Sequence, residues 1–148
     1  MFRGLNKISF DTKGRISIPT KYREELLKIS NKKLICTIDL DYCLLIYPLS
    51  SWLKIEQQIM KLPTLNATSR MLQRLLVGHA TDIYMDKSGR VLIPSELRDF
   101  SMVNKEVMLI GQGNRFELWD YSRWTKLRDK WLKSDKYSLP KEFEDLTF

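Results

Sequence analysis

Residues 11–19 are Asp-Thr-Lys-Gly-Arg-Ile-Ser-Ile-Pro, and residues 86–94 are Asp-Lys-Ser-Gly-Arg-Val-Leu-Ile-Pro. The shared Asp, Gly, Arg, Ile and Pro stand at a constant offset of 75 residues, which Arg23 and Arg98 also keep. Ordered agreement of this kind, at one fixed spacing, is typical of an internal duplication. The stretch therefore predicts that one small structural unit occurs twice in the chain.

A second match lies further along the chain. Residues 44–48 resemble residues 116–120 at an offset of 72, and Trp52 and Trp124 share that offset. A change of three residues in one loop explains the difference between the two offsets. We predict a first repeat with its helix over residues 1–62, a helical connector over 63–77, and a second repeat with a C-terminal helix and tail over 78–148.

Each copy is predicted to contain a strand, a turn, a strand, a short helix, and two more strands around a second turn. Apolar β-type runs on both sides of the polar Asp-x-x-Gly predict a hairpin, because Asp accepts backbone N–H groups and Gly supplies a positive φ. Pro19 and Pro94 are expected in the first turn of the short helix, where a missing N–H costs nothing. This pattern predicts an α+β, β-rich fold.

A longer amphipathic helix is predicted to end each copy. Ser50 or Ser51 would cap the first of these helices and Ser122 the second. Trp131 is expected on the inward face of the second helix. Gly78 is well placed as the C′ residue of the connector helix. The C-terminal tail is expected to be ordered only against a neighbour.

The chain has 148 residues, a formal net charge of +7 and a sequence pI of about 9.4. Either half alone would bury too little apolar surface to be robust, so the halves are expected to pack on each other or on another subunit. A basic balance attracts nucleic acid, an anionic membrane or acidic proteins. Because there is no long apolar run and no signal-like N-terminus, we expect a cytoplasmic protein with no membrane partner.

The sequence offers little for metal or cofactor chemistry. Cys36 and Cys43 are expected to be small core residues, and together with the single His79 they are too few for a tetrahedral metal site. Two cysteines make no disulfide framework, which fits a reducing compartment. We therefore expect neither a metal nor a cofactor.

Two other patterns have interpretations that we do not favour. Asp39 and Asp41 follow an apolar run, as in the nucleophile loop of haloacid-dehalogenase-type phosphatases, but the second copy has Gln112 and Asn114 in this turn. The tryptophans could stack on single-stranded bases, yet their spacing on amphipathic helices favours packing. No convincing set of catalytic side chains is present, so an enzyme is not expected.

The basic character concentrates around the Asp-x-x-x-Arg turns. The residues expected to structure these loops are Asp11, Gly14, Asp86 and Gly89. Turn geometry does not require Arg15 and Arg90, so these arginines are candidate contacts to a polyanion. The other candidate contacts are Thr12, Lys13, Lys87, Arg3 and Lys7. A two-stranded ribbon can enter the DNA major groove, where Arg can bind guanine O6 and N7 and Lys can neutralise phosphates.

Residues 1–4, the block at 11–19 and its second copy at 86–94 together resemble the MraZ family, over nearly the whole chain from residue 1 to about 135. This family belongs to the broader AbrB-type (SpoVT-AbrB-like) transcription factors. The resemblance implies a tandem duplicated swapped-hairpin β-barrel with flanking helices. It also implies a nucleoid-associated, DNA-binding transcriptional regulator that assembles as a homo-oligomeric ring. Such regulators bind short direct repeats upstream of the division and cell-wall gene cluster.

Carried over by position, the resemblance makes Arg15 and Arg90 the key contacts to double-stranded DNA. Thr12 and Lys13 would add phosphate contacts in the first copy. That copy is expected to dominate, because Arg3, Lys7 and Lys21 make the surroundings of its strand more basic. The alternative function is an AbrB-like protein-interaction module or antitoxin without strong DNA specificity.

Overall fold

The computed structural model describes residues 1–134 and 138–147. The fold is α+β with an antiparallel sheet, which confirms the predicted class. The first half contains β1 (Phe2–Ser9), β2 (Arg15–Ser17), α1 (Thr20–Ser30), β3 (Lys33–Ile38), β4 (Leu44–Pro48) and α2 (Leu49–Met60). The second half contains β5 (Thr81–Tyr84), β6 (Arg90–Leu92), α4 (Ser95–Phe100), β7 (Glu106–Gly113), β8 (Arg115–Asp120) and α5 (Tyr121–Lys133). Between them lie α3 (Ala67–Leu72) and a π-helical turn, η1 (Gln73–Val77), and the tail holds a 3-10 turn, η2 (Lys141–Phe143).

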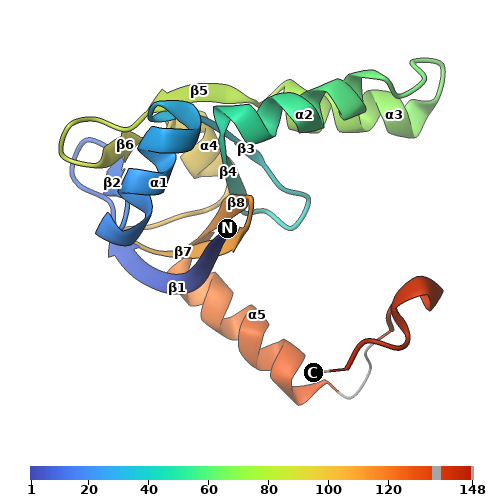
Figure 1. Ribbon diagram of the computed structural model, residues 1–148. Helices are drawn as coiled ribbons and strands as arrows, with labels where there is room; N and C mark the ends of the chain where they lie inside the picture. The colour runs from blue at the N-terminus through green and yellow to red at the C-terminus, as the bar shows by residue number, and fades with distance from the viewer. Residues whose placement is uncertain (135–137, 148) are drawn as a thin grey trace.

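The two halves exchange their outer strands. A six-stranded sheet has the order β1-β7-β8-β4-β3-β5, and β2 pairs with β6 in a separate two-stranded ribbon. Along β1, Phe2 lies opposite Gly113 of β7 and Ser9 lies opposite Glu106. In the reciprocal arrangement, β5 pairs with β3 of the first half. Each half therefore supplies an edge strand to the other (Figure 1).

The predicted hairpins have different outcomes. The second hairpin of each copy is confirmed, because β3 pairs with β4 and β7 pairs with β8. The prediction of a first hairpin in each copy is wrong: the tight turn forms, but the two strands beside it do not pair with each other. β1 instead forms a long ladder with β7, and β2 turns away to pair with β6. These partners lie too far away in sequence for a local pattern to indicate them.

The closed barrel that the resemblance implies is not confirmed. The sheet is open, with β1 and β5 as its edge strands. The β2–β6 ribbon packs against the main core through Ile16 and Val91, both of which are fully buried. In Figure 1 the ribbon and its two turns lie at the left, at the opposite end of the molecule from α3.

The main core joins residues of both halves. Phe116 of β8 is fully buried, and its ring centroid lies 4.4 Å from that of Phe2 in β1 and 4.9 Å from that of Tyr22 in α1. Phe116, the largest of the fully buried side chains, thus packs between elements of the other half. This is the packing of halves that their small size predicts.

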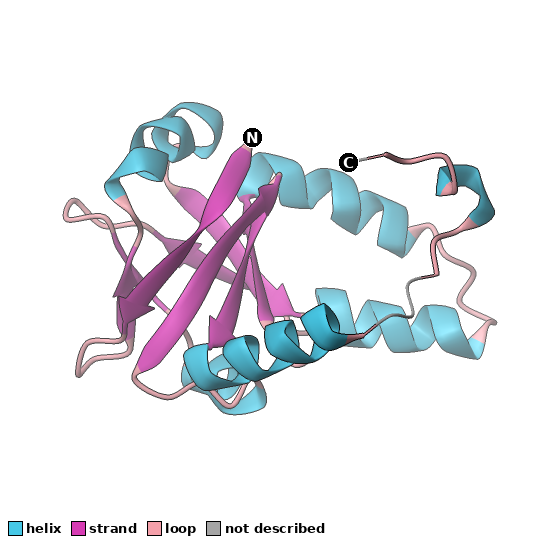
Figure 2. Cartoon of the chain, turned by 90° about the horizontal axis from the view of Figure 1, so that it is seen from below, coloured by secondary structure: helices cyan, strands magenta, loops and turns pink. Residues whose placement is uncertain are grey.

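The opposite face of the sheet carries two separate apolar clusters. Trp52 of α2 is buried in one, and Trp119 packs with half-buried Trp124 of α5 in the other. Trp131 lies on the predicted face, since its ring centroid is 6.0 Å from that of Trp124, but at 45% exposure it is less buried than predicted. Two helical segments, α2 with α3 and α5, extend to the same side of the molecule, away from the β2–β6 ribbon (Figure 2). Within the described residues, no helix has the length and apolar character that crossing a membrane requires.

The long helices begin differently from the prediction. α2 follows Pro48 directly and has no side-chain cap. α5 is capped by Asp120, whose Oδ2 accepts a first-turn backbone N–H at 3.1 Å. The predicted serine caps are therefore wrong at Ser50, Ser51 and Ser122. In both cases the strand runs straight into the helix, so the helix starts before the serines.

Two expectations about helix ends also need correction. Pro19 and Pro94 each stand immediately before a short helix, one position earlier than predicted. Gly78 follows η1 with a φ of −62°, so it is not the left-handed C′ residue that we expected. The π-helical turn before it already ends the connector, with the Gly78 N–H donating to the carbonyl of Gln73 at 3.0 Å.

Candidate nucleic-acid interface

The first turn is held by the carboxylate of Asp11. Its Oδ1 accepts the backbone N–H groups of Lys13 and Arg15, both at 2.9 Å, and its Oδ2 accepts the Nε–H of Arg15 at 2.8 Å. Gly14 has a φ of 82°, a left-handed conformation that favours glycine. Asp11 therefore shapes the turn and orients the arginine side chain at the same time.

The second turn repeats this geometry. Oδ1 of Asp86 accepts the backbone N–H groups of Ser88 and Arg90, both at 2.9 Å, and its Oδ2 accepts the Nε–H of Arg90 at 3.1 Å. Gly89 has a φ of 78°. The two Asp-x-x-x-Arg motifs thus make two equivalent structures.

These hydrogen bonds hold the pKa of both carboxyls below the ordinary value. For Asp11, the backbone N–H of Arg15 lowers the pKa most, and the Arg15 side chain adds to this effect. For Asp86, the backbone N–H of Arg90 has the same role. Both carboxylates therefore stay ionised at neutral pH and keep their hold on the arginines.

The two turn arginines lie at the surface with their outer nitrogens available. The side chains of Arg15 and Arg90 are 26% and 37% exposed. No described residue accepts a hydrogen bond from the terminal nitrogens of either guanidinium. Because Nε is already bound, each planar fork is held in place before any ligand arrives, which reduces the entropy lost on binding. Lys13 and Lys87 are exposed at the tips of the same turns.

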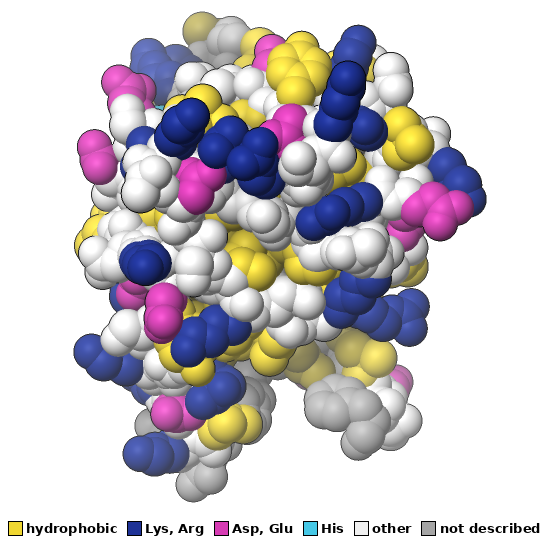
Figure 3. Space-filling view, turned by 90° about the vertical axis from the view of Figure 1, so that its left-hand side faces the viewer, with side chains coloured by type: hydrophobic (Ala, Val, Ile, Leu, Met, Phe, Trp, Pro, Cys, Tyr) yellow, Lys and Arg dark blue, Asp and Glu magenta, His cyan; other side chains and the backbone are white. Residues whose placement is uncertain are grey.

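The β2–β6 ribbon places both turns on one face of the molecule. Beyond its ladder, the N–H of Ile18 donates to the carbonyl of Gly89 at 2.8 Å, and the N–H of Ile93 donates to the carbonyl of Gly14 at 3.1 Å. Each turn is thus hydrogen-bonded to a segment of the other half. Figure 3 shows this side of the molecule, where Lys and Arg side chains gather with Asp and Glu side chains among them.

Two arginines that the sequence did not assign to the site brace these turns. Arg98 of α4 donates its Nε–H to the carbonyl of Ile93 at 3.0 Å, and a Cβ on Gly14 would come within 2.8 Å of its Cζ. Arg23 of α1 donates its Nε–H to the carbonyl of Ile18 at 2.7 Å, and a Cβ on Gly89 would collide with its guanidinium. A Cβ in either turn would therefore displace the bracing guanidinium as well as strain the positive φ. The sequence signal for these arginines was their shared offset of 75 residues.

Two predicted contacts lie apart from the turns. Arg3 is opposite Gln112, at the end of β1 that is distant from the first turn. Lys7 is closer, but its Nζ lies 3.4 Å from Oε2 of Glu106 and 4.3 Å from the ring centroid of Tyr121. The structure therefore does not bring Arg3 to the turn, and it pairs Lys7 with residues of β7 and α5. Their contact with DNA stays a prediction.

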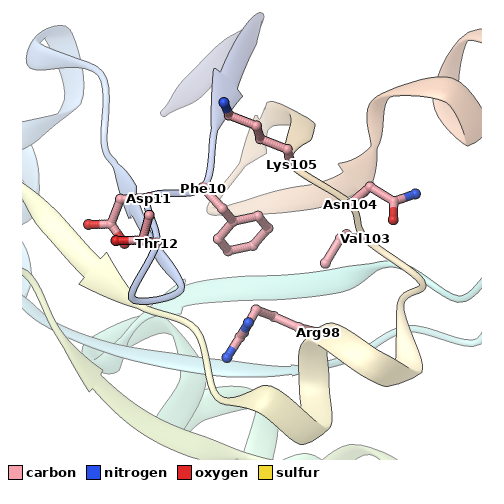
Figure 4. A pocket seen from close by; sticks show the side chains of 7 residues that line it. All are labelled: Phe10, Asp11, Thr12, Arg98, Val103, Asn104 and Lys105. Atoms are coloured by element: carbon pink, nitrogen blue, oxygen red, sulfur yellow. The ribbon is translucent and has the colours of Figure 1, made fainter.

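A hollow of about 350 Å³ lies beside the first turn, between this turn and α4. Its lining residues are Phe10, Asp11, Thr12, Arg98, Val103, Asn104 and Lys105 (Figure 4). The ring of Phe10 points into this hollow, whereas the carboxylate of Asp11 points away from it. A smaller counterpart of about 220 Å³ adjoins the second turn and includes Arg23 and Lys87 in its lining. Within residues 1–134 and 138–147, no three His, Cys, Asp or Glu side chains gather in a group that could hold a metal ion.

Both halves of the chain match the same family model, described as an MraZ protein, antitoxin-like, over residues 1–75 and 76–143. The chain belongs to the MraZ family, a family of transcriptional regulators. It is 48% identical over 135 residues to the transcriptional regulator MraZ of Thioalkalivibrio sulfidiphilus, which covers 91% of this chain and 90% of that protein. It is 46% identical over 148 residues to the regulator of the same name from Legionella pneumophila (97% of each chain). The Coxiella burnetii regulator MraZ is 49% identical over 142 residues (95% of this chain, 91% of the relative).

Proposed function

We propose that this protein regulates transcription by binding double-stranded DNA in a sequence-specific manner through its two Asp-x-x-x-Arg turns. The observation that carries the proposal is the paired placement of Arg15 and Arg90. Each is held by an aspartate through Nε, and each keeps its outer nitrogens available on the same face. The net charge of +7 and the similarity to transcriptional regulators support a polyanionic partner of this kind.

The turn residues would divide the contact between bases and phosphates. Arg15 and Arg90 would donate two hydrogen bonds to guanine O6 and N7 in the major groove. Lys13 and Lys87 would neutralise phosphates and release counterions, and Thr12 would donate a hydrogen bond to a phosphate. We expect the first copy to contribute more, because Arg3 and Lys7 add positive charge along its strand, although the structure does not bring Arg3 to the turn. The reaction is binding alone, with no catalytic step and no cofactor.

Several copies would act together on short direct repeats of the division and cell-wall gene cluster. In this proposal the repeats of residues 1–62 and 78–148, joined by the connector at 63–77, form one subunit of a homo-oligomeric ring in the cytoplasm, associated with the nucleoid. Each subunit would take one DNA repeat. Individually weak contacts then combine through a high effective concentration, which explains how one small basic face can give specific binding.

The test is to select genomic DNA fragments with the purified full-length chain and to sequence them. We expect enrichment of tandem short repeats near the promoter of the protein's own gene. Affinity for the selected fragment should fall about 10³-fold between 50 and 200 mM salt if about six phosphates are contacted. Recovery of no specific fragment, with a flat salt profile, would instead favour the antitoxin-like protein-interaction module.

A further inference from the structure

A basic and apolar groove lies along α5, on the face that packs on the end of β8. It is a hollow of about 280 Å³ lined by Trp119, Arg123, Lys126, Leu127 and Lys130. Trp119 and Leu127 supply its apolar part, and the guanidinium carbon of Arg123 lies 5.5 Å from the Trp119 ring centroid. The volume is small for a drug-sized ligand. It suits an inserted side chain from a peptide.

The cations of this groove are of two kinds. Arg123 is fixed, because its Nη1 donates to the carbonyls of Tyr42 at 2.7 Å and Ser101 at 3.0 Å. Lys126 and Lys130 are exposed one turn apart, and neither has an ion-pair partner among residues 1–134 and 138–147. The groove therefore presents two unpaired ammonium groups beside an apolar hollow.

The C-terminal tail has the complementary chemistry. In residues 138–147, Leu139, Phe143 and Leu146 recur at spacings of four and three, and all three are exposed. The carboxylates of the segment are Glu142, Glu144 and Asp145, against a single lysine. In the described part of the chain these carboxylates pair with no cation. The tail segment thus presents exposed apolar and acidic side chains together, a combination typical of an interaction surface.

We propose that the tail of one copy docks in the α5 groove of a second copy. Phe143 would enter the hollow between Trp119 and Leu127, and the tail carboxylates would face Lys126 and Lys130. In Figure 1 and Figure 2 the ribbon of the tail lies apart from α5, the helix that carries the groove. A surface of this kind links identical chains, either reciprocally in pairs or head to tail.

The docked tail would be one contact between subunits of the proposed assembly. Its formation does not require DNA. α5 extends away from the turn-bearing end of the molecule, so Lys126 and Lys130 are poorly placed to follow a duplex that lies on the turns (Figure 1). The hollow between the cations is apolar and can accept an apolar side chain. A peptide has such side chains and a phosphate backbone does not, so a peptide is the better ligand for this groove.

Charge reversal on the full-length chain tests the proposal. We expect Lys126→Glu with Lys130→Glu to weaken self-association at least about tenfold in sedimentation velocity without DNA, because like charges then face each other. The triple change of Glu142, Glu144 and Asp145 to Lys should weaken it equally. Combining both sets in one chain should restore association. As a matched control, Lys54→Glu with Lys61→Glu reverses two exposed lysines of α2 and its C-terminus and should change nothing.

A cross-link distinguishes the source of the tail. We expect a disulfide between chains when a Leu127→Cys protein is mixed with a Phe143→Cys protein under oxidising conditions. Absence of this link, or a link that forms only when both changes are in one chain, would overturn docking between copies. If the lysine reversal lowers DNA affinity and leaves association unchanged, the groove is a DNA contact and the proposal is wrong. Failure of the proposed function has a different signature, which is loss of specific DNA selection by a fully associated protein.

Discussion

Arg15→Ala is expected to abolish sequence-specific DNA binding while the fold and the assembly survive. A bidentate arginine–guanine contact contributes about 1–3 kcal/mol of discrimination, which is roughly 5- to 150-fold in affinity for each contact. When several subunits bind one fragment, these losses multiply. The Asp11 carboxylate would keep its two backbone hydrogen bonds in the turn, so the change removes the contact and not the scaffold.

Gel-shift titration of the genome-selected fragment measures this effect, and two variants calibrate it. Arg90→Ala should cause a smaller loss, because the second copy contributes less. Arg128→Ala removes one positive charge from α5, where Arg128 pairs with Asp129, and should leave specific affinity nearly unchanged. Equal affinity of the Arg15→Ala protein and the parent chain would refute the assignment of the turns.

Phe116→Ala is expected to lower the free energy of unfolding by about 3–5 kcal/mol, as for other buried Phe-to-Ala changes. The Phe116 ring fills the space between Phe2 and Tyr22, which belong to the other half of the chain. Its loss should therefore destabilise both halves together. Since domains of this size are typically stable by only about 5–15 kcal/mol, the variant should be close to unfolding at 37 °C.

Urea denaturation followed by tryptophan fluorescence and by circular dichroism measures this loss. Both probes should report a single, shared transition, because the main core is built from residues of both halves. Leu65→Ala is the control: it shortens a side chain that is 95% exposed and lies outside the core and the tail, and it should change the free energy of unfolding by no more than about 0.5 kcal/mol. Two separate transitions in the Phe116→Ala protein would contradict the interlocked core.

The sequence predicted those parts of the fold that depend on neighbours along the chain. The Asp-x-x-Gly turns and the β3–β4 and β7–β8 hairpins follow from local turn chemistry and apolar runs. The partners of β1 and β5 do not, because Phe2 pairs with Gly113 across most of the chain length. A repeat predicts that a unit occurs twice. It does not predict which copy completes which sheet.

Helix caps show the same limit on a smaller scale. Ser122 suits an N-cap by propensity, but α5 begins directly after β8, so Asp120 at the end of β8 is the N-cap residue. Where a strand continues directly into a helix, the geometry of the strand end decides the cap. Propensity at the following residues then has no effect.

The candidate site was predictable in its motif and not in its supports. The bond from Asp11 to Arg15 follows from a spacing of four residues around a glycine turn. The packing of Arg98 on Gly14 joins different halves, and only the repeated offset of 75 residues indicated that Arg98 had a role. Charge alone also did not indicate that Arg3 lies at the end of β1 distant from the first turn, and its contact with DNA stays a prediction.

The central claim is that the tips of the turns face DNA, and protection of an engineered thiol tests it most directly. The native thiols of Cys36 and Cys43 are buried, and burial raises the pKa of Cys36 to about 12, so neither should react quickly. The measurement is the rate of maleimide alkylation of Thr12→Cys with and without the selected DNA fragment, beside Thr68→Cys on α3 at the far end of the molecule. The account predicts strong protection by DNA at position 12 and none at position 68. Equal rates at position 12 with and without bound DNA would contradict it.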